Sequence, residues 1–399
     1  MADRTTSAEG AAVPWAWPAG LAVVAAALFG STWTDAIQAA DGGEVVAAAC
    51  NLGVAHPPGY PLHTLLGHAL CALPASTPAG RVGLLSVLAG VWAVLMVYGA
   101  VLRLNRNPWA AAVAGLTLAT GSVFWRHSSV AEVFALNAAL CGSVVYLALT
   151  VARAPAERAR RGWSALLGVA VGLALSNHHS ATLVLPLAAV ALAWPRPTAG
   201  AAAARTLVAL AGCVVGLLPY LQLVLADPDV LPRWGQADTL EGLIHHVLRR
   251  DYGTFSLTIG GEAEPLANLW HFARQLPSQL GYLLWPLALL GGVALFFAGA
   301  RRPLGRLLAH VPREVGVTLA LLPLLAGPLF LMLFNIAPEG IGAQVAERFH
   351  ILPTLLLAIA VGVGLGVVDA TWLRGEGRGG RRVFWHASAW VVLGLTALR

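Results

Sequence analysis

The chain contains no lysine, and only 11% of its residues are charged. So few charges cannot cover the surface of a soluble protein of 399 residues. Motifs of nucleotide-binding enzymes and hydrolases are missing too: there is no GxxxxGK[S/T] loop, no GxSxG, and no GxGxxG that opens a helix after a strand. No HExxH occurs, and the four cysteines lack metal-ligand spacing. These absences argue against soluble nucleotide chemistry and against a metal site.

Apolar residues, in contrast, are abundant: they make up 58% of the chain, and the mean hydropathy is +0.72. Crossing the hydrocarbon core of a bilayer takes about 17 to 25 apolar residues in a helix. Runs of this kind predict an all-α polytopic membrane protein with about eleven transmembrane helices, two of them short. The predicted spans are 15–33, 82–102, 108–125, 130–152, 163–176, 180–195, 205–225, 280–299, 315–334, 350–370 and 383–399.

The arginines test this topology, because cytoplasmic loops carry the excess of basic residues. With the amino terminus inside, 17 of the 25 arginines fall in inner segments. The net charge of +6 is then explained by topology, and no nucleic-acid partner is expected. Residues 1–30 begin with a weak basic end, one arginine against two acids, so we interpret them as a retained first helix and not a cleaved signal.

The chain is expected to form one multi-span domain, 1–399, with two larger outer segments. The first outer loop, 34–81, includes a short apolar stretch, Pro61 to Leu73, that reads as a re-entrant or interfacial helix. The second, 226–279, is long enough for a small subdomain. The cysteines are interpreted as small packing residues, although a bridge between Cys50 and Cys71 on the outer side is an open alternative.

Ionisable and polar residues gather in the outer segments, which indicates a functional site there, since such groups are costly near a span. The acids Asp41 and Glu44, followed by His56 in the rigid turn Pro57-Pro58-Gly59, are the main candidates. The other candidates are Tyr60, Glu132, Asn177, His178, His179, Arg250, Tyr252, Glu347 and Arg348.

Structural roles compete with functional ones for several of these residues. Asn177, His178 and His179 stand between two spans with almost no room for a solvated loop, which favours function. Capping and catalysis are equally compatible with Glu132, at the start of a span. Glu347 and Arg348 either pair with each other or leave the arginine free to hold a phosphate. His245, His246 and His271 are interpreted as solvated loop residues.

Together these segments resemble the uncharacterised-domain 2723 family. The resemblance rests on DGGE followed by LGVAHPPGYPL, and on WRHSSVAEVFALN, LALSNHHSATLVLP, PRWGQADTLEGLIHHVLRRDYGT and AERFHILP in the same order, over about residues 30 to 355. That family is similar to the transmembrane-protein-260-type protein O-mannosyltransferases of the GT-C superfamily. The resemblance implies a membrane enzyme that uses a polyprenyl-phosphate sugar on the outer face of the bacterial inner membrane.

The resemblance also implies roles for individual residues. Asp41 would act as the base that takes the proton from a protein hydroxyl, with Glu44 in reserve, while the anomeric carbon inverts and the lipid phosphate departs. Phosphate-binding groups would be His56, His178, Arg250 and Arg348. No cofactor or metal is strictly required, and mannose as the sugar rests on the resemblance alone. The expected partners are the lipid-linked sugar, an acceptor protein and the bilayer.

Two other classes of function compete with this one. A transporter or flippase of a lipid-linked sugar would place its binding site near the midplane of the membrane. The outer position of the carboxylates argues against it, and the Asn-His-His segment between short spans favours it. A noncatalytic scaffold would have no need of Asp41, Glu44 and the His-Pro-Pro-Gly turn together.

Overall fold

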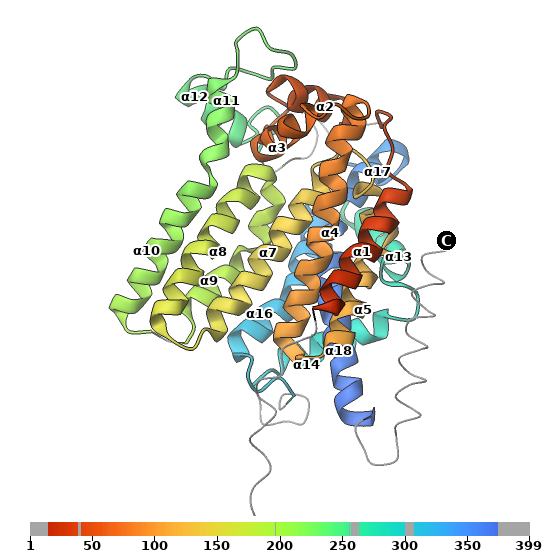
Figure 1. Cartoon of the computed structure of the whole chain (residues 1–399), viewed down its shortest axis with the longest axis vertical. Coiled ribbons are helices and arrows are strands. Elements are labelled where there is room, and N and C mark those ends of the chain that lie inside the picture. Colours follow the sequence, from red (N-terminus) through yellow and green to blue (C-terminus); the bar gives the residue numbers. More distant parts are fainter. Residues whose placement is uncertain are drawn as a thin grey trace, which may run out of the picture.

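The computed structural model describes residues 15–38, 41–195, 197–254, 264–299 and 307–373, together with residues 256 and 262. Within them the chain is helical, and the only β pairing is an isolated bridge between Val54 and Arg233. Figure 1 shows a bundle of long helices with shorter ones gathered at one end. The helices of the first half are α1 (Ala16–Ser31), α2 (Gly42–Asn51), α3 (Pro61–Cys71), α4 (Pro78–Asn105), α5 (Pro108–Ala119), α6 (Ser122–His127), α7 (Phe134–Arg153), α8 (Glu157–Asn177), η1 (His179–Val184) and α9 (Leu185–Ala193).

The second half of the chain completes the bundle with further helices. They are α10 (Ala199–Gly216), η2 (Leu218–Tyr220), α11 (Leu221–Leu225), α12 (Leu240–Val247), α13 (Pro265–Leu280), α14 (Trp285–Phe296), α16 (Arg313–Leu324), η3 (Leu325–Leu329), α17 (Gly340–Arg348), α18 (Ile351–Val368) and η4 (Asp369–Leu373). Within the described ranges, four helical segments are long and apolar enough to cross a membrane: Pro78–Asn105, Phe134–Arg153, Ala199–Leu225 and Ile351–Thr371. A fifth arises if α13 and α14, bent by 99°, count as one span.

Each of the first ten predicted spans coincides with helix, and the eleventh, 383–399, lies outside the described residues. Several of these helices, such as α1 and α5, are shorter than a full crossing. The number of eleven spans therefore stays a prediction, as do the domain boundaries, whereas the all-helical membrane architecture is confirmed. Pro61–Cys71 is helical, as expected for a short element beside the first loop.

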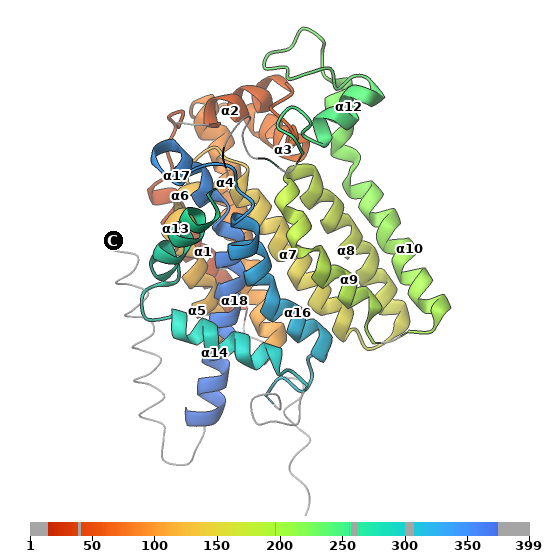
Figure 2. The same ribbon diagram turned by 180° about the vertical axis from the view of Figure 1, so that it is seen from behind.

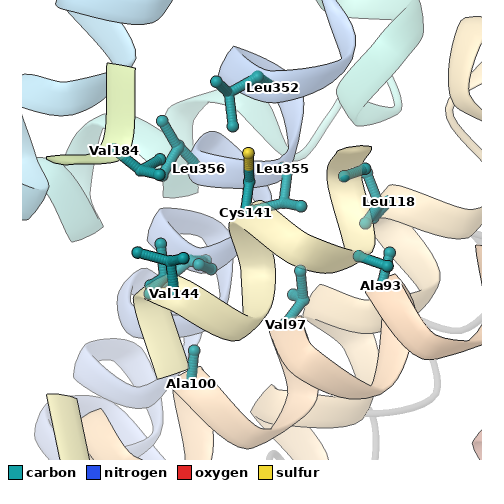
Figure 3. Close-up of a cluster of buried hydrophobic side chains, with 14 of the residues drawn as sticks. Ala93, Val97, Ala100, Leu118, Cys141, Val144, Val184, Leu352, Leu355 and Leu356 are labelled. Carbon is teal, nitrogen blue, oxygen red and sulfur yellow. The ribbon is translucent and has the colours of Figure 1, made fainter. Parts of the chain in front are cut away.

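The core of the bundle is built from alanine, valine and leucine on α4, α7 and α18. Figure 3 shows Val97 of α4, Val144 of α7 and Leu355 of α18 facing one another around Cys141. Small residues bring neighbouring helices still closer: a Cβ on Gly168 of α8 would lie 1.9 Å from the Ala209 carbonyl of α10. Close backbone approach through glycine is a common way to pack helices in membranes, where burial of apolar side chains supplies little driving force.

The two ends of the bundle differ in their contents. α2, α3, α11, α12 and α17 lie together at one end, which is the upper end in Figures 1 and 2. The arginines assigned to inner loops, such as Arg103 and Arg153, come at the opposite ends of α4 and α7. The sorting that the basic residues predicted is therefore present in the fold, and the candidate residues share one end.

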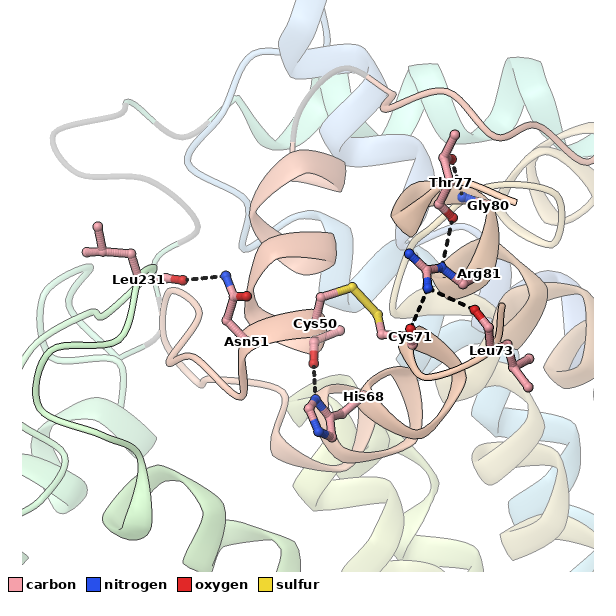
Figure 4. Close-up of a disulfide and its surroundings, with 10 residues drawn as sticks. Cys50, Asn51, His68, Cys71, Leu73, Thr77, Gly80, Arg81 and Leu231 are labelled. Atoms are coloured by element: carbon pink, nitrogen blue, oxygen red, sulfur yellow. Dashed lines mark hydrogen bonds between the residues drawn. A yellow bond between two sulfur atoms is a disulfide. The ribbon is translucent and has the colours of Figure 1, made fainter. Parts of the chain in front are cut away.

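A disulfide between Cys50 and Cys71 ties the end of α2 to the end of α3 (Figure 4). This settles the alternative that the sequence left open for this pair, while Cys141 and Cys213 are free. Arg81 of α4 donates to the Cys71 and Leu73 carbonyls, the latter at 2.9 Å, and so satisfies the end of α3. The α2–α3 hairpin is thus covalently closed and anchored on α4.

Candidate functional site

The His-Pro-Pro-Gly turn connects α2 to α3 and shapes one wall of the site. The Gly59 amide donates to the His56 carbonyl at 2.9 Å, and Gly59 has a φ of +93°, which favours glycine. A Cβ at Gly59 would also come within 3.0 Å of Leu223 and of His246, so the turn is packed against α11 and α12. Tyr60 follows in the left-handed region, directly before Pro61 opens α3. The turn therefore fixes where the His56 and Tyr60 side chains point.

Glu44, in the first turn of α2, holds His56 with both carboxylate oxygens. Oε1 accepts the His56 backbone N–H at 2.7 Å, and Oε2 lies 2.6 Å from His56 Nδ1. Burial raises the pKa of Glu44, but the hydrogen bonds from His56 lower it more, so the net shift is downward. The ionised carboxylate fixes the imidazole proton on Nδ1, and Nε2 then accepts the Tyr60 hydroxyl at 2.8 Å.

Asp41, at the start of α2, has a partner from the far end of the sequence. Its carboxylate forms an ion pair with Arg348, at the end of α17, and the Arg348 side chain is only 7% exposed. The same guanidinium lies 3.9 Å from Glu132, a buried carboxylate before α7. Burial raises the pKa of Glu132 to about 7, opposed by Arg348. One buried cation is therefore shared by two carboxylates.

Glu347 and Arg348 do not pair with each other, so that structural alternative was wrong. Glu347 instead accepts a hydrogen bond from Arg126 at 2.6 Å and one from Gln275 at 2.5 Å. The consecutive residues point to different sides of α17, one toward the surface and one into the site. Arg348 is accordingly free of Glu347 and directed at Asp41.

The Asn-His-His segment lies where α8 ends and η1 begins. Asn177 is fully buried and donates to the Val133 carbonyl at 3.2 Å, which is a structural contact. His178 Nδ1 accepts the Ser180 backbone N–H at 3.1 Å, so the neutral ring carries its proton on Nε2. The His178 ring is stacked on Tyr60 with centroids 5.8 Å apart. Two expected site residues from separate loops are thus in direct contact.

Two adjoining cavities meet at this cluster. A polar one of about 240 Å³ is lined by Asp41, His56, Pro58, Tyr60, Phe134, His178, His179, Arg249, Tyr252, Ile336, Val345, Arg348 and Phe349. An apolar one of about 540 Å³ is lined by Leu175, His178, His179, Ser180, Thr182, Leu217, Tyr220, Val247, Leu248, Arg249, Thr254, Phe330, Leu333, Phe334 and Phe349. Four residues line both, and these are His178, His179, Arg249 and Phe349.

Among the predicted residues, Asp41, His56, Pro58, Tyr60, His178, His179, Tyr252 and Arg348 line the polar cavity. Glu44 and Glu132 lie behind it, and Arg250 is exposed and lines neither cavity. The neighbouring Arg249, which sequence reasoning missed, lines both, and its Nε has no hydrogen-bond partner among the described residues. The sequence Arg249-Arg250 indicates a cation at this place. Which of the two side chains faces inward depends on the turn after α12, where Arg249 has a φ of +53°.

His245 and His246 differ sharply, although both were interpreted as solvated. His245 is half exposed and pairs with Asp251 at 2.8 Å, whereas His246 is 2% exposed beneath the His-Pro-Pro-Gly turn. The interpretation was wrong for His246, because α12 packs that face against the loop. No group of three or more His, Cys, Asp or Glu side chains that could hold a metal ion occurs in the described part of the chain.

The fold of the chain is similar to the folds of two solved structures. The chain superimposes on ArnT from Cupriavidus metallidurans, a structure bound to undecaprenyl phosphate, with a TM-score of 0.59 at 15% identity over 94% of this chain and 64% of that one. The Archaeoglobus fulgidus oligosaccharyltransferase, solved with Zn and sulfate, gives 0.58 at 14% identity over 96% and 52%. At such identities the likeness defines the fold.

The sequence relationship is more specific. Residues 41–199 match the family model of the protein O-mannosyl-transferase TMEM260 N-terminal domain. The mouse protein O-mannosyl-transferase TMEM260 is 34% identical over 267 residues, which are 64% of this chain and 37% of that protein. The Dictyostelium discoideum protein of the same name is 26% identical over 360 residues, 85% and 43% respectively. The predicted resemblance is confirmed, and the chain spans about two fifths of these relatives' length.

Proposed function

We propose that this protein is a membrane glycosyltransferase that transfers mannose from a polyprenyl-phosphate donor to a protein hydroxyl, with inversion at the anomeric carbon. The observation that carries the proposal is the pair of adjoining cavities, one polar and one apolar, with Arg249 and His178 at their junction. A lipid-linked sugar has the same layout, because a phosphate joins a polar sugar to an apolar chain. The names of the relatives and the undecaprenyl phosphate in the ArnT structure support this choice.

In the proposed arrangement the polyprenyl chain occupies the apolar cavity between η2, α12 and the segment that follows α16. The phosphate lies at the junction, within reach of Arg249 and Arg348, and charge-assisted hydrogen bonds to a phosphate are the strong ones. His178 presents Nε2–H as a neutral donor. His56 presents an acceptor nitrogen, so we assign the phosphate to His178, Arg249 and Arg348, and not to His56 or Arg250.

Asp41 is the proposed base. Its carboxylate lines the polar cavity and is about one third exposed, at 34%, whereas both oxygens of Glu44 are occupied by His56 behind the cavity wall. The acceptor oxygen attacks the anomeric carbon, its proton passes to Asp41, and the bond from that carbon to the phosphate oxygen breaks. The leaving phosphate carries the electron pair away and is stabilised by the arginines. Glu44 fixes His56, which orients Tyr60.

We infer that the site faces the outside of the bacterial inner membrane and that the amino terminus is cytoplasmic. Two features support this orientation. The Cys50–Cys71 disulfide lies at the same end as the site, and disulfides persist in oxidising compartments. The inner-loop arginines described above lie at the opposite end.

The test is transfer of radiolabelled mannose from polyprenyl-phosphate-mannose to membrane proteins by the purified chain, with polyprenyl-phosphate-glucose as the comparison donor. We expect label on protein from the mannose donor and an anomeric configuration opposite to that of the donor. Label that stays on the lipid but crosses the bilayer of proteoliposomes would establish a transporter instead. The His178–Tyr60 contact speaks against that alternative, because it joins the Asn-His-His segment to the first loop at one end of the bundle.

A further inference from the structure

An exposed apolar surface outside the spanning segments lies on α12, and its last residue, Leu248, also lines the apolar cavity. Leu240, Ile244 and Leu248 follow the helical spacing i, i+4, i+8 and are 75%, 42% and 41% exposed. Residues four apart share a helix face, so the three side chains form one stripe. Large apolar side chains scattered singly on a surface need no explanation, but an ordered stripe on an otherwise covered helix indicates a contact.

The rest of the α12 circumference is accounted for. Leu243 packs into a cluster with Val54 and with Leu223 of α11, and His246 is buried beneath Gly59. On the other edge of the stripe stand exposed Glu241 and the His245–Asp251 pair. The helix therefore has a protein-covered apolar side, an uncovered apolar stripe and a polar edge, in that order around its axis.

The uncovered stripe continues the apolar surface of a spanning segment. Ala199–Leu225 is long and apolar enough to cross the membrane, and only 28% of its most apolar window is buried within the protein. Toward α12 this segment exposes Leu218 and Leu221, each 53%, and Leu225, 78%, and Leu231 follows at 76%. Figures 1 and 2 both place α12 beside α11 at the end of α10. The exposed apolar surface of this segment thus leads to the exposed stripe of α12 at the end of α10.

We propose that α12 is an interfacial helix that lies on the bilayer surface, with Leu240, Ile244 and Leu248 inserted at the boundary between headgroups and acyl chains. Its uncovered stripe beside a polar edge is the arrangement of helices that lie in this plane. The neighbouring spanning segment holds α12 against the lipid, so the short length of the helix is no obstacle. The occupant of the stripe is the lipid surface itself, and the inference does not depend on the reaction proposed above.

This position has a consequence for the cavities. Val247 and Leu248, at the end of α12, line the apolar cavity, and Arg249, the next residue, lines both. The lipid contact of α12 and the cavity wall are therefore parts of one short segment. The opposite face of that segment supports Gly59 of the turn that carries His56. The bilayer surface thereby positions the junction at which the two cavities meet.

The test uses the full chain in phosphatidylcholine–phosphatidylglycerol nanodiscs, one copy per disc, with a nitroxide label at Ile244→Cys. Cys141→Ala and Cys213→Ala remove the free thiols, and the disulfide-bonded pair does not react. Collisions of the label with oxygen, which partitions into lipid, are compared with collisions with a water-soluble nickel chelate. Matched labels at Leu221→Cys, on the spanning segment, and Glu241→Cys, on the polar edge, give the lipid and water references. Leu240→Cys serves as a second position on the stripe.

We expect the labels at 240 and 244 to show an oxygen-to-nickel collision ratio several-fold above that at 241 and close to that at 221. A ratio at 240 and 244 equal to that at 241 would place the stripe in water and overturn the proposal. Labels shielded from both reagents would mean that protein covers the stripe, which would also overturn it.

Discussion

Asp41 and Glu44 stand three residues apart at the start of α2, yet their surroundings differ in kind. Glu44 is paired with His56, twelve residues away in the same loop, and both of its oxygens are used. Asp41 is paired with Arg348, which is 307 residues away, and it faces a cavity. The first pair is a closed local contact, whereas the second is assembled by the whole bundle and leaves an oxygen for another molecule.

This comparison supports Asp41 as the proposed base. A base needs access to the proton it removes, and of these two carboxylates it is Asp41 that lines the polar cavity. Glu44 acts indirectly. It sets the tautomer of the His56 imidazole, and His56 Nε2 then accepts the hydrogen bond from the Tyr60 hydroxyl. The difference also predicts how substitutions change the stability of the protein. These include substitutions at Arg348, the shared buried cation, and at Glu132, the titrating acid beside it.

The largest effect on stability is expected from Arg348→Gln. This change leaves Glu132 buried beside Asp41 without a cation, and breaking a buried pair costs about 3–5 kcal/mol. Thermal unfolding of the purified protein measures it, and label transfer should be lost as well. Arg126→Gln is the matched control, because Arg126 is 50% exposed and its pair with Glu347 should contribute at most about 1 kcal/mol. Equal losses in the two variants would contradict the buried role of Arg348.

Glu44→Gln should have the next largest effect. The amide can still accept the His56 backbone N–H, but the charged contact with Nδ1 is lost, and hydrogen bonds to charged groups contribute about 1.5–3 kcal/mol. We expect lower thermal stability with turnover reduced by less than about tenfold, since a positioning contact is lost and not the base. Turnover that disappears in this variant at full stability would transfer the role of base to Glu44.

Arg249→Gln should weaken donor binding by about tenfold, which corresponds to about 1.4 kcal/mol. The reason is its place at the junction of the cavities, and titration of polyprenyl phosphate against the purified protein measures the effect. Arg250→Gln is the matched control, since that side chain is exposed and outside both cavities. A larger loss with Arg250→Gln would restore the role that the sequence suggested for it.

A further prediction concerns the pH dependence of stability, to which Glu132 contributes. The folded pKa of about 7 lies above the ordinary 4.5, so the stability that this group contributes is fully present below 4.5 and is lost as the pH rises through 7. Glu132→Gln removes that dependence, so the variant should gain stability relative to the wild type across this window and stay level above it. Thermal unfolding of both proteins over this pH range measures the difference. Parallel pH curves would show that Glu132 does not titrate there.

Sequence alone predicted the helical membrane fold and the sharing of one end by the candidate residues. Both follow from local signals, since apolar runs give the spans and arginines give their direction. The turn at Gly59 was likewise readable, because glycine and proline specify the backbone directly. The partners of individual charges were not. Which of Arg249 and Arg250 turns inward, and whether Arg348 contacts Glu347 or Asp41, depends on how distant helices pack.

His246 is another residue whose surroundings could not be predicted from the sequence. It falls in a predicted outer segment, where polar residues are usually solvated, yet α12 buries it against the His-Pro-Pro-Gly turn. The disulfide between Cys50 and Cys71 stayed an open alternative for a related reason, since spacing does not reveal which cysteines meet in space. The contacts that define the site are those that cross the longest stretches of chain.

The most direct test of this account is the rate of label transfer by Asp41→Asn, measured beside Asp35→Asn. Asp35 is an exposed acid of the same loop, and asparagine at position 41 keeps an oxygen for Arg348. We predict that Asp41→Asn binds polyprenyl phosphate as the wild type does but transfers about 10²- to 10⁴-fold more slowly, the usual contribution of a general base, whereas Asp35→Asn transfers normally. Wild-type transfer by Asp41→Asn would contradict the central assignment.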